Sequence, residues 1–124
     1  AIQIPDELLV IFDRGHLNQI LWNLVRNAWQ HCQKKEGSIR IAGRAGYMGD
    51  AVICELQDDG AGIPAELRGQ IFEPFFTTRT GGTGLGLYIA RELADANGAT
   101  LELLPKGPGA HFRITLRRAL AASR

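Results

Sequence analysis

The most constraining feature of the sequence is a run of apolar residues with helical spacing near its start. Between residues 17 and 32 an apolar side chain recurs every three or four positions. These positions are Leu17, Ile20, Leu21, Leu24, Val25, Ala28 and Cys32. Such spacing predicts an amphipathic helix with one buried face. Asp13 precedes the run as a candidate N-cap, and Gly37 follows it.

Alternation of apolar and polar residues predicts strands in the rest of the chain. The segments with strand character are 8–13, 38–45, 51–58, 100–105 and 111–118. We expect the second and third to form a hairpin around the turn at 46–50, and the last two to form a closing pair. Helical segments are predicted at 65–75, as short turns, and at 85–97, where Asn97 and Gly98 end the helix.

Composition limits the kind of protein that this chain can be. Its 124 residues predict a single domain spanning 1–124, and the start at Ala1 without methionine predicts a piece of a longer protein with a frayed tail at about 119–124. The net charge of +1 argues against nucleic acid or a membrane surface as partner. No apolar run is long enough to span a bilayer, and no secretion signal is expected. Cys32 and Cys54 are expected to be buried thiols.

A glycine cluster stands directly before the second predicted helix. In "GGTGLG" (81–86) four of the six residues are glycine, although each costs about 0.5–1 kcal/mol relative to alanine in a regular element. A helix N-terminus offers unpaired N–H groups and partial positive charge, and glycines let the backbone approach a ligand closely. The pattern therefore favours a phosphate-binding site formed by the backbone of Gly82, Thr83, Gly84, Leu85 and Gly86.

The glycine cluster also allows other interpretations. A flexible loop with a glycine N-cap is the plain structural alternative. The segment is not a P-loop, because GxxxxGK[ST] is absent, and it is not the dinucleotide fingerprint, because GxGxG here follows a loop and not a strand.

Three polar residues form a stripe along the first predicted helix. Asn23, Asn27 and His31 are spaced i, i+4 and i+8, beside the buried face. Asparagine is a poor residue for a helix interior, and its amide oxygen is a hard neutral ligand that suits Mg²⁺. The stripe is compatible with a metal and phosphate site, although by itself it is explained more simply by solvated or helix-capping asparagines.

The segment "DDGAGIP" (58–64) follows the second strand of the predicted hairpin. A buried carboxylate on Asp58 could accept a hydrogen bond from an exocyclic amine such as that of adenine. Gly60 and Gly62 would leave room for a flat ring. The alternative is a polar strand end followed by an ordinary turn.

Taken together, these segments resemble the sensor histidine kinases. "NQILWNLVRNAWQH" is similar to their N box, "DDGAGIP" to the G1 box, "IFEPFFTTR" to the F box, "GGTGLGL" to the G2 box and "GPGAHFRITL" to the closing strand motif. The lid "EPFFTTRTGGTGLGL" most resembles kinases of the nitrogen-regulation and pilus-regulation type. The resemblance implies an α+β fold of the GHKL (Bergerat) type. This is a two-layer α/β sandwich whose mixed, mainly antiparallel sheet is covered on one face by helices, with ATP between helices and a mobile lid.

The resemblance also implies roles for single residues. Asn27 matches the asparagine that binds Mg²⁺, and Asn23 the one that helps at the phosphates. Asp58 matches the adenine-binding aspartate, with Gly60 and Gly62 beside the ring. His31 is expected at the edge of the site.

For the lid, the resemblance implies anchoring by the aromatic pair Phe75 and Phe76. Arg79 stands where this group often has lysine, so it is expected to reach the γ-phosphate and to act with Asn23 and Asn27 in catalysis. The nucleotide-binding set is completed by Ile63, Phe76, Thr78, Arg79, Gly82, Thr83, Gly84, Leu85 and Gly86.

Asn23 also bears on the type of reaction. Hydrolytic relatives carry a glutamate there as the general base for water, whereas an amide cannot take a proton. Phosphoryl transfer to histidine, which depends on positioning and electrostatics, is therefore favoured. The alternatives are a hydrolytic ATPase or serine/threonine kinase of the same fold, or a nucleotide-binding module without catalysis.

The histidine acceptor is expected elsewhere. None of His16, His31 and His111 stands in a sequence context like that of the phosphorylated histidine of these kinases. We therefore expect the partners to be the histidine-bearing dimerisation domain of the same kinase and a downstream response regulator. The fragment itself is expected to be a monomer in the cytoplasm, even where the full-length protein is anchored to a membrane.

Overall fold

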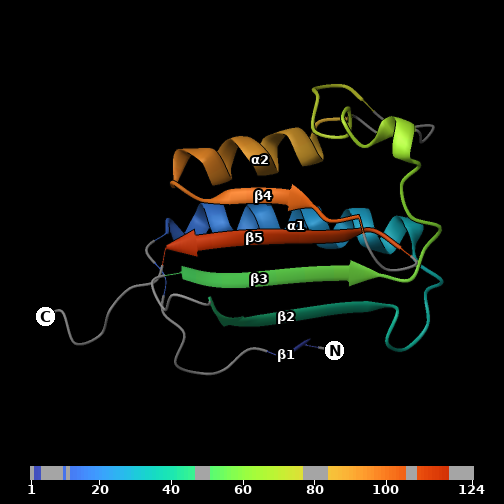
Figure 1. Ribbon diagram of the computed structural model, residues 1–124, viewed down its shortest axis with the longest axis horizontal. Helices are drawn as coiled ribbons and strands as arrows, with labels where there is room; N and C mark the ends of the chain where they lie inside the picture. Colours follow the sequence, from blue (N-terminus) through green and yellow to red (C-terminus); the bar gives the residue numbers. More distant parts are fainter. Residues whose placement is uncertain are drawn as a thin grey trace, which may run out of the picture.

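The computed structural model describes residues 2–3, 10, 12–46, 51–76, 84–105 and 109–117. Within them, a five-stranded sheet packs against two α-helices (Figure 1). The strands are β1 (Ile2–Gln3), β2 (Ile39–Ala45), β3 (Ala51–Asp58), β4 (Thr100–Leu103) and β5 (His111–Arg117). The helices are α1 (Arg14–His31), the short 3₁₀ helix η1 (Ala65–Leu67) and α2 (Gly86–Ala96).

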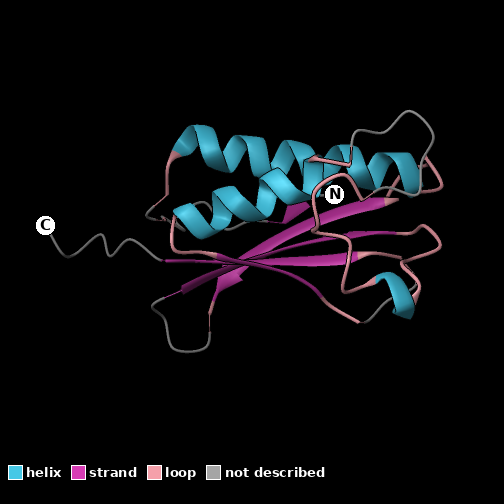
Figure 2. Cartoon of the chain, turned by 90° about the horizontal axis from the view of Figure 1, so that it is seen from above, coloured by secondary structure: helices cyan, strands magenta, loops and turns pink. Residues whose placement is uncertain are grey.

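The sheet is mixed and mainly antiparallel, as predicted. Its strand order is β1-β2-β3-β5-β4, and only the β1–β2 pair is parallel among the described strands. Figure 2 shows α1 and α2 together on one side of the sheet. This arrangement confirms the expected two-layer α+β fold.

The core lies between the helices and the sheet because residues on alternate positions of each strand face the helices. On β5 these are Phe112, Ile114 and Leu116, each at most 3% exposed. They meet Ile20, Leu24 and Ala28 of α1 and Ala90 and Ala94 of α2 in one cluster. Burial of this apolar surface is the main force that joins the two layers. None of the described helices is long and apolar enough to cross a bilayer.

Helix α1 begins three residues earlier than the apolar run indicates. Oδ1 of Asp13 accepts a hydrogen bond from the backbone N–H of His16 at 2.9 Å, which confirms Asp13 as the N-cap. The cap starts the helix at Arg14, before the first apolar residue of the run. Helix α2 ends as predicted: Asn97 is its C-cap, and Gly98 follows with φ +71°.

The strand predicted at 8–13 is wrong where the structure describes it. Val10 makes only an isolated bridge, Phe12 lies in a bend and Asp13 caps α1. The short strand β1, which pairs in parallel with β2, was not predicted. The hairpin of β2 and β3 is confirmed in register from Ile39 opposite Asp58 onwards, although residues 47–50 of its turn lie outside the described residues. The tail 118–124 also lies outside them.

Candidate functional site

Asp58 ends β3 with an almost fully buried carboxylate. The residue is 3% exposed, and its Oδ1 accepts hydrogen bonds from the backbone N–H groups of Gly60 at 2.8 Å and Ala110 at 3.2 Å. Its Oδ2 is buried and accepts no hydrogen bond from any described residue. Because buried polar atoms are nearly always paired, an orphaned carboxylate oxygen points to a missing donor.

Two glycines shape the surroundings of Asp58. A side chain on Gly60 would overlap the backbone carbonyl of His31, so the turn after β3 lies tightly against the end of α1. A side chain on Gly109 would overlap the carbonyl oxygen and the Oδ1 of Asp58. Gly60 was predicted to lie at this site, as was Gly62, which has φ +82°. Gly109 was missed, although it stands in the closing strand motif "GPGA".

The polar stripe of α1 joins two parts of the site. Near the middle of the helix, Nδ2 of Asn23 donates a hydrogen bond to the carbonyl of Gly86 at 3.2 Å, at the start of α2. At the end of the helix, His31 lies against Gly60. These two contacts are eight residues apart, or about 12 Å along the helix axis. The stripe therefore runs from the N-terminus of α2 to the turn after Asp58.

Asn27 lies between these two contacts. Its backbone carbonyl accepts a hydrogen bond from Nδ1 of His31 at 2.8 Å, while no described residue hydrogen-bonds its side-chain amide. His31, which is exposed, is thus held to its own helix. No three His, Cys, Asp or Glu side chains gather as a metal site in the described part of the chain. A Mg²⁺ ion here would depend on the Asn27 amide and on ligand oxygens, which is a donor set that Mg²⁺ accepts.

A backbone hydrogen bond joins Phe75 to Gly84, two residues before α2. The backbone N–H of Phe75 donates to the carbonyl of Gly84 at 2.8 Å, which joins the two ends of the stretch between them. Gly84 has φ +75°, and a side chain there would overlap the Phe75 backbone. Glycine is therefore required at this position.

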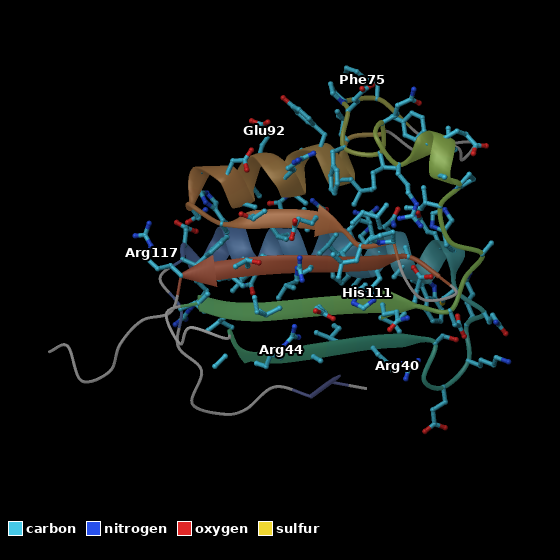
Figure 3. All side chains as sticks on the ribbon, in the orientation of Figure 1. Arg40, Arg44, Phe75, Glu92, His111 and Arg117 are labelled. Atoms are coloured by element: carbon cyan, nitrogen blue, oxygen red, sulfur yellow. The ribbon has the colours of Figure 1, made fainter. Side chains whose placement is uncertain are left out.

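The two F-box aromatics differ. Phe76 packs against the core cluster, as an anchor would. Phe75 has φ +67° and is 73% exposed, so its side chain does not pack into the core (Figure 3). Its expected contact with the lid stays a prediction, because residues 77–83 lie outside the described residues. What Phe75 contributes is its backbone contact with Gly84.

The remaining predicted site residues fall into two groups. Thr78, Arg79, Gly82 and Thr83 lie outside the described residues. Leu85 and Gly86 form the N-cap and first residue of α2, and Ile63 packs at the margin of the core. A side chain on Gly86 would meet open space, so the close packing that explains Gly60 and Gly84 does not apply to it.

A further residue, Asp59, was missed by the sequence analysis. Its Oδ1 accepts from the backbone N–H of Gln33 and its Oδ2 from the hydroxyl of Ser38, both at 2.8 Å, while Nε2 of Gln33 donates to its carbonyl at 3.1 Å. These hydrogen bonds, first that of the Gln33 N–H, hold the pKa of the Asp59 carboxyl below its usual value. Asp59 thus ties the loop after α1 to the turn that follows Asp58.

His111 lies on the other face of the sheet, away from the helices, in the same region as Arg44 and Arg40 (Figure 3). It is 7% exposed, and its Nε2–H donates to Oε1 of Glu55 at 2.7 Å. Burial raises the pKa of the Glu55 carboxyl, but the hydrogen bonds and charges of His111 and Arg44 outweigh it, so that the pKa is lowered. His111 therefore has a structural partner apart from the Asp58 site.

Comparison with known proteins adds a family and a set of relatives. Residues 12–120 match the family model described as histidine kinase-, DNA gyrase B- and HSP90-like ATPase. The chain is 35% identical to the nitrogen regulation protein NtrY of Azorhizobium caulinodans over 93% of its length, and 40% identical to the sensor protein kinase PilS of Pseudomonas aeruginosa over 83%. It spans only 16% and 20% of these two relatives.

Solved structures agree with the fold. The catalytic domain of histidine kinase ThkA, in a nucleotide-free form, superimposes with a TM-score of 0.81 at 34% identity, covering 94% of this chain and 78% of that one. Full-length ShkA in complex with AMPPNP superimposes with a TM-score of 0.77 at 30% identity, covering 100% of this chain and 27% of ShkA.

Proposed function

Because the chain belongs to the histidine kinase-, DNA gyrase B- and HSP90-like ATPase family, we propose that it is the ATP-binding catalytic domain of a two-component sensor histidine kinase. It binds Mg-ATP and donates the γ-phosphoryl group to a histidine on the dimerisation domain of the same kinase, which then passes it to a response regulator. The identity to NtrY and PilS over most of this chain supports the proposal. The domain works in the cytoplasm and is monomeric by itself.

The observation that carries the proposal is the orphaned Oδ2 of Asp58. Its partner atom Oδ1 is fixed by two backbone N–H groups, so Oδ2 is held in one direction as an acceptor. The exocyclic amine of adenine is a donor that satisfies it, and the guanine carbonyl at the same ring position is not. Asp58 therefore selects adenine, with Gly60 and Gly62 leaving room beside the ring.

In the middle of the stripe, Asn27 would supply its amide oxygen to Mg²⁺, and Asn23 at the far end lies beside the N-terminus of α2, where the triphosphate would bind. When bound, Mg²⁺ neutralises charge that develops on the phosphates. Gly82, Thr83, Gly84 and Leu85 supply backbone N–H groups to the phosphates, and Thr78 and Arg79 approach the γ-phosphate. Closure of this lid excludes water from the phosphoryl group.

Transfer rather than hydrolysis follows from the chemistry of Asn23. Its amide nitrogen donates to the Gly86 carbonyl, and an amide has no basic atom that could take a proton from water. A histidine imidazole is a better nucleophile than water and needs no such base. The domain therefore holds ATP until a histidine is presented.

Titration calorimetry with a non-hydrolysable ATP analogue, with and without Mg²⁺, tests the site. Asp58→Ala is expected to weaken binding at least about tenfold under both conditions, since it removes a hydrogen bond to a charged acceptor. Asn27→Ala is expected to remove the Mg²⁺ dependence. Glu92→Ala, on the exposed side of α2 (Figure 3), is the control and is expected to leave the affinity and its Mg²⁺ dependence unchanged. Wild-type affinity in both site variants would contradict the assignment.

Phosphoryl transfer is tested by fusing the dimerisation domain of PilS to the N-terminus of this chain. With labelled ATP, the fusion is expected to become phosphorylated on histidine, and the chain alone is not. Rapid ATP turnover by the chain alone, lost in Asn23→Ala, would instead identify a hydrolase. Failure to bind nucleotide by a folded chain would identify a module without catalysis.

A further inference from the structure

The outer side of α1 exposes two large aromatic side chains. Trp22 is 62% exposed and Trp29 is 51% exposed, and they are the only two tryptophans in the chain. At 100° per residue both lie about 140–160° around the helix from the buried Leu24. They are seven residues apart, or about 10.5 Å along the axis. Neither contributes to the core, so folding does not explain them.

The residues around the two tryptophans have the composition of a protein-binding surface. Arg26 lies between them on the same side, and we name Trp22, Arg26 and Trp29 the tryptophan row. Tryptophan and arginine are the residue types that dominate binding energy at protein interfaces. Exposed amide side chains of α1 border the row as a neutral polar rim, at positions Asn18, Gln19 and Gln30.

The charge around the row is positive. Helix α1 contains no aspartate or glutamate, and Nζ of Lys34 lies 5.5 Å from the ring centre of Trp29. A partner that covers the row must pair with Arg26, because an arginine buried at an interface without a carboxylate is costly. The partner therefore carries acidic residues.

We propose that the tryptophan row is the docking surface for an amphipathic helix of another protein domain, with apolar residues at heptad spacing and carboxylates flanking them. The seven-residue interval between Trp22 and Trp29 is the repeat with which two helices pack side by side. A membrane surface fits less well, because interfacial helices carry a strongly basic polar face, whereas three neutral amide side chains of α1 border this row.

The docking surface is separate from the nucleotide site. Asn23 and Asn27 lie about 100–160° around α1 from the two tryptophans. A helix on the row leaves the stripe of Asn23, Asn27 and His31 uncovered. The proposal thus goes beyond the proposed function, and it can hold or fail independently of it.

Tryptophan fluorescence reads this surface directly, because no other tryptophan contributes to the signal. The probe is a helical peptide of three heptads with leucine at heptad positions a and d and glutamate at e and g. The matched control peptide has lysine in place of each glutamate. We expect the acidic peptide to shift the emission to shorter wavelength, saturably and with one peptide per chain, and the basic peptide to bind at least about tenfold more weakly.

Variants of the chain locate the binding. Trp22→Ala and Trp29→Ala, followed by calorimetry, are each expected to raise the peptide Kd at least about tenfold while leaving the circular dichroism and the ATP-analogue affinity unchanged. Arg26→Glu is expected to reverse the preference between the two peptides. Glu92→Ala on α2 is the control and leaves peptide binding unchanged.

Three results would overturn the proposal. One is equal affinity for the acidic and basic peptides, or no binding of either. Another is concentration-dependent dimerisation in sedimentation that Trp22→Ala abolishes, since a second copy would then occupy the row. The third is binding to vesicles of phosphatidylcholine and phosphatidylglycerol that depends on Trp22 and Trp29.

Discussion

Gly109 lies so close to Asp58 that any side chain at residue 109 would overlap the carbonyl oxygen and the Oδ1 of the aspartate. The next residue, Ala110, makes two hydrogen bonds with Asp58: its carbonyl accepts from the Asp58 backbone N–H, and its own N–H donates to Oδ1. The segment leading into β5 therefore fixes the direction of the carboxylate. The chemistry at Asp58 depends on a glycine far away in the sequence.

Gly109→Ala is expected to displace the Asp58 carboxylate, to lower the free energy of unfolding by about 1–3 kcal/mol, and to weaken nucleotide binding. Urea unfolding and calorimetry with the ATP analogue measure the two effects. Gly69→Ala is the control, because residue 69 is exposed and a side chain there meets open space. Equal behaviour of the two variants would show that Gly109 does not hold Asp58 in place.

Alanine substitutions at Gly84 and Gly86, two residues apart, are expected to have opposite effects on stability. Gly84→Ala places a side chain at φ +75° and against the Phe75 backbone, which is expected to cost about 1–3 kcal/mol and to weaken ATP binding more than adenosine binding. Gly86→Ala meets open space at the first residue of α2 and is expected to be neutral or mildly stabilising. Thermal unfolding and nucleotide titration of both variants measure these effects. A Gly86→Ala variant that is less stable than Gly84→Ala would contradict the prediction.

The sequence predicts well those features that depend on local spacing. The period of apolar residues locates α1, and the alternation in 38–45 and 51–58 locates the β2–β3 hairpin, because helices and half-buried strands have distinct periods. Asn23 and Asn27 were singled out because asparagine is a poor residue inside a helix, and Asp58 because it ends a strand beside two glycines, whereas their expected roles come from the resemblance to the sensor histidine kinases. The apolar spacing alone would start α1 at Leu17, whereas the candidate N-cap Asp13 places its start at Arg14, and the structure confirms the cap.

Asn23→Ala tests the link between the two helices. It removes the hydrogen bond to the Gly86 carbonyl and is expected to lower the free energy of unfolding by about 0.5–1.5 kcal/mol. Asn23→Asp is expected to be worse than Asn23→Ala, because a carboxylate would face that carbonyl without a donor. Gln19→Ala, exposed on the same helix, is the control. If Asn23→Ala is as stable as wild type in urea unfolding, the hydrogen bond to Gly86 does not stabilise the fold.

The hydrogen bonds to Asp59 predict a dependence on pH. Since its pKa is lowered in the folded state, the carboxylate stabilises the fold above the ordinary aspartate pKa of 3.8, and this contribution is lost as the pH falls through the lowered value. Asp59→Ala is therefore expected to be less stable than wild type at pH of about 7, and the difference is expected to shrink below pH of about 3.8. Urea unfolding across this range measures it, with Glu92→Gln as the control. If the difference in the free energy of unfolding between wild type and Asp59→Ala stays constant with pH, the charge of Asp59 does not stabilise the fold.

Asp59 and Gly109 also show what the sequence could not provide. Asp59 is joined to Gln33 and Ser38, and Gly109 to Asp58, by contacts between segments whose approach depends on the folded sheet. Nothing in the local pattern around either residue indicates its partner. The roles of Thr78, Arg79, Gly82 and Thr83 stay predictions, because these residues lie outside the part of the chain that the structure describes.

The most direct measurement compares ADP with purine riboside diphosphate, in which hydrogen replaces the exocyclic amine, on wild type and on Asp58→Ala. If the free carboxylate oxygen of Asp58 receives that amine, wild type binds ADP about tenfold to a hundredfold more tightly than the analogue, and Asp58→Ala binds the two alike. An undiminished preference for ADP in Asp58→Ala, or no preference in wild type, would contradict the account.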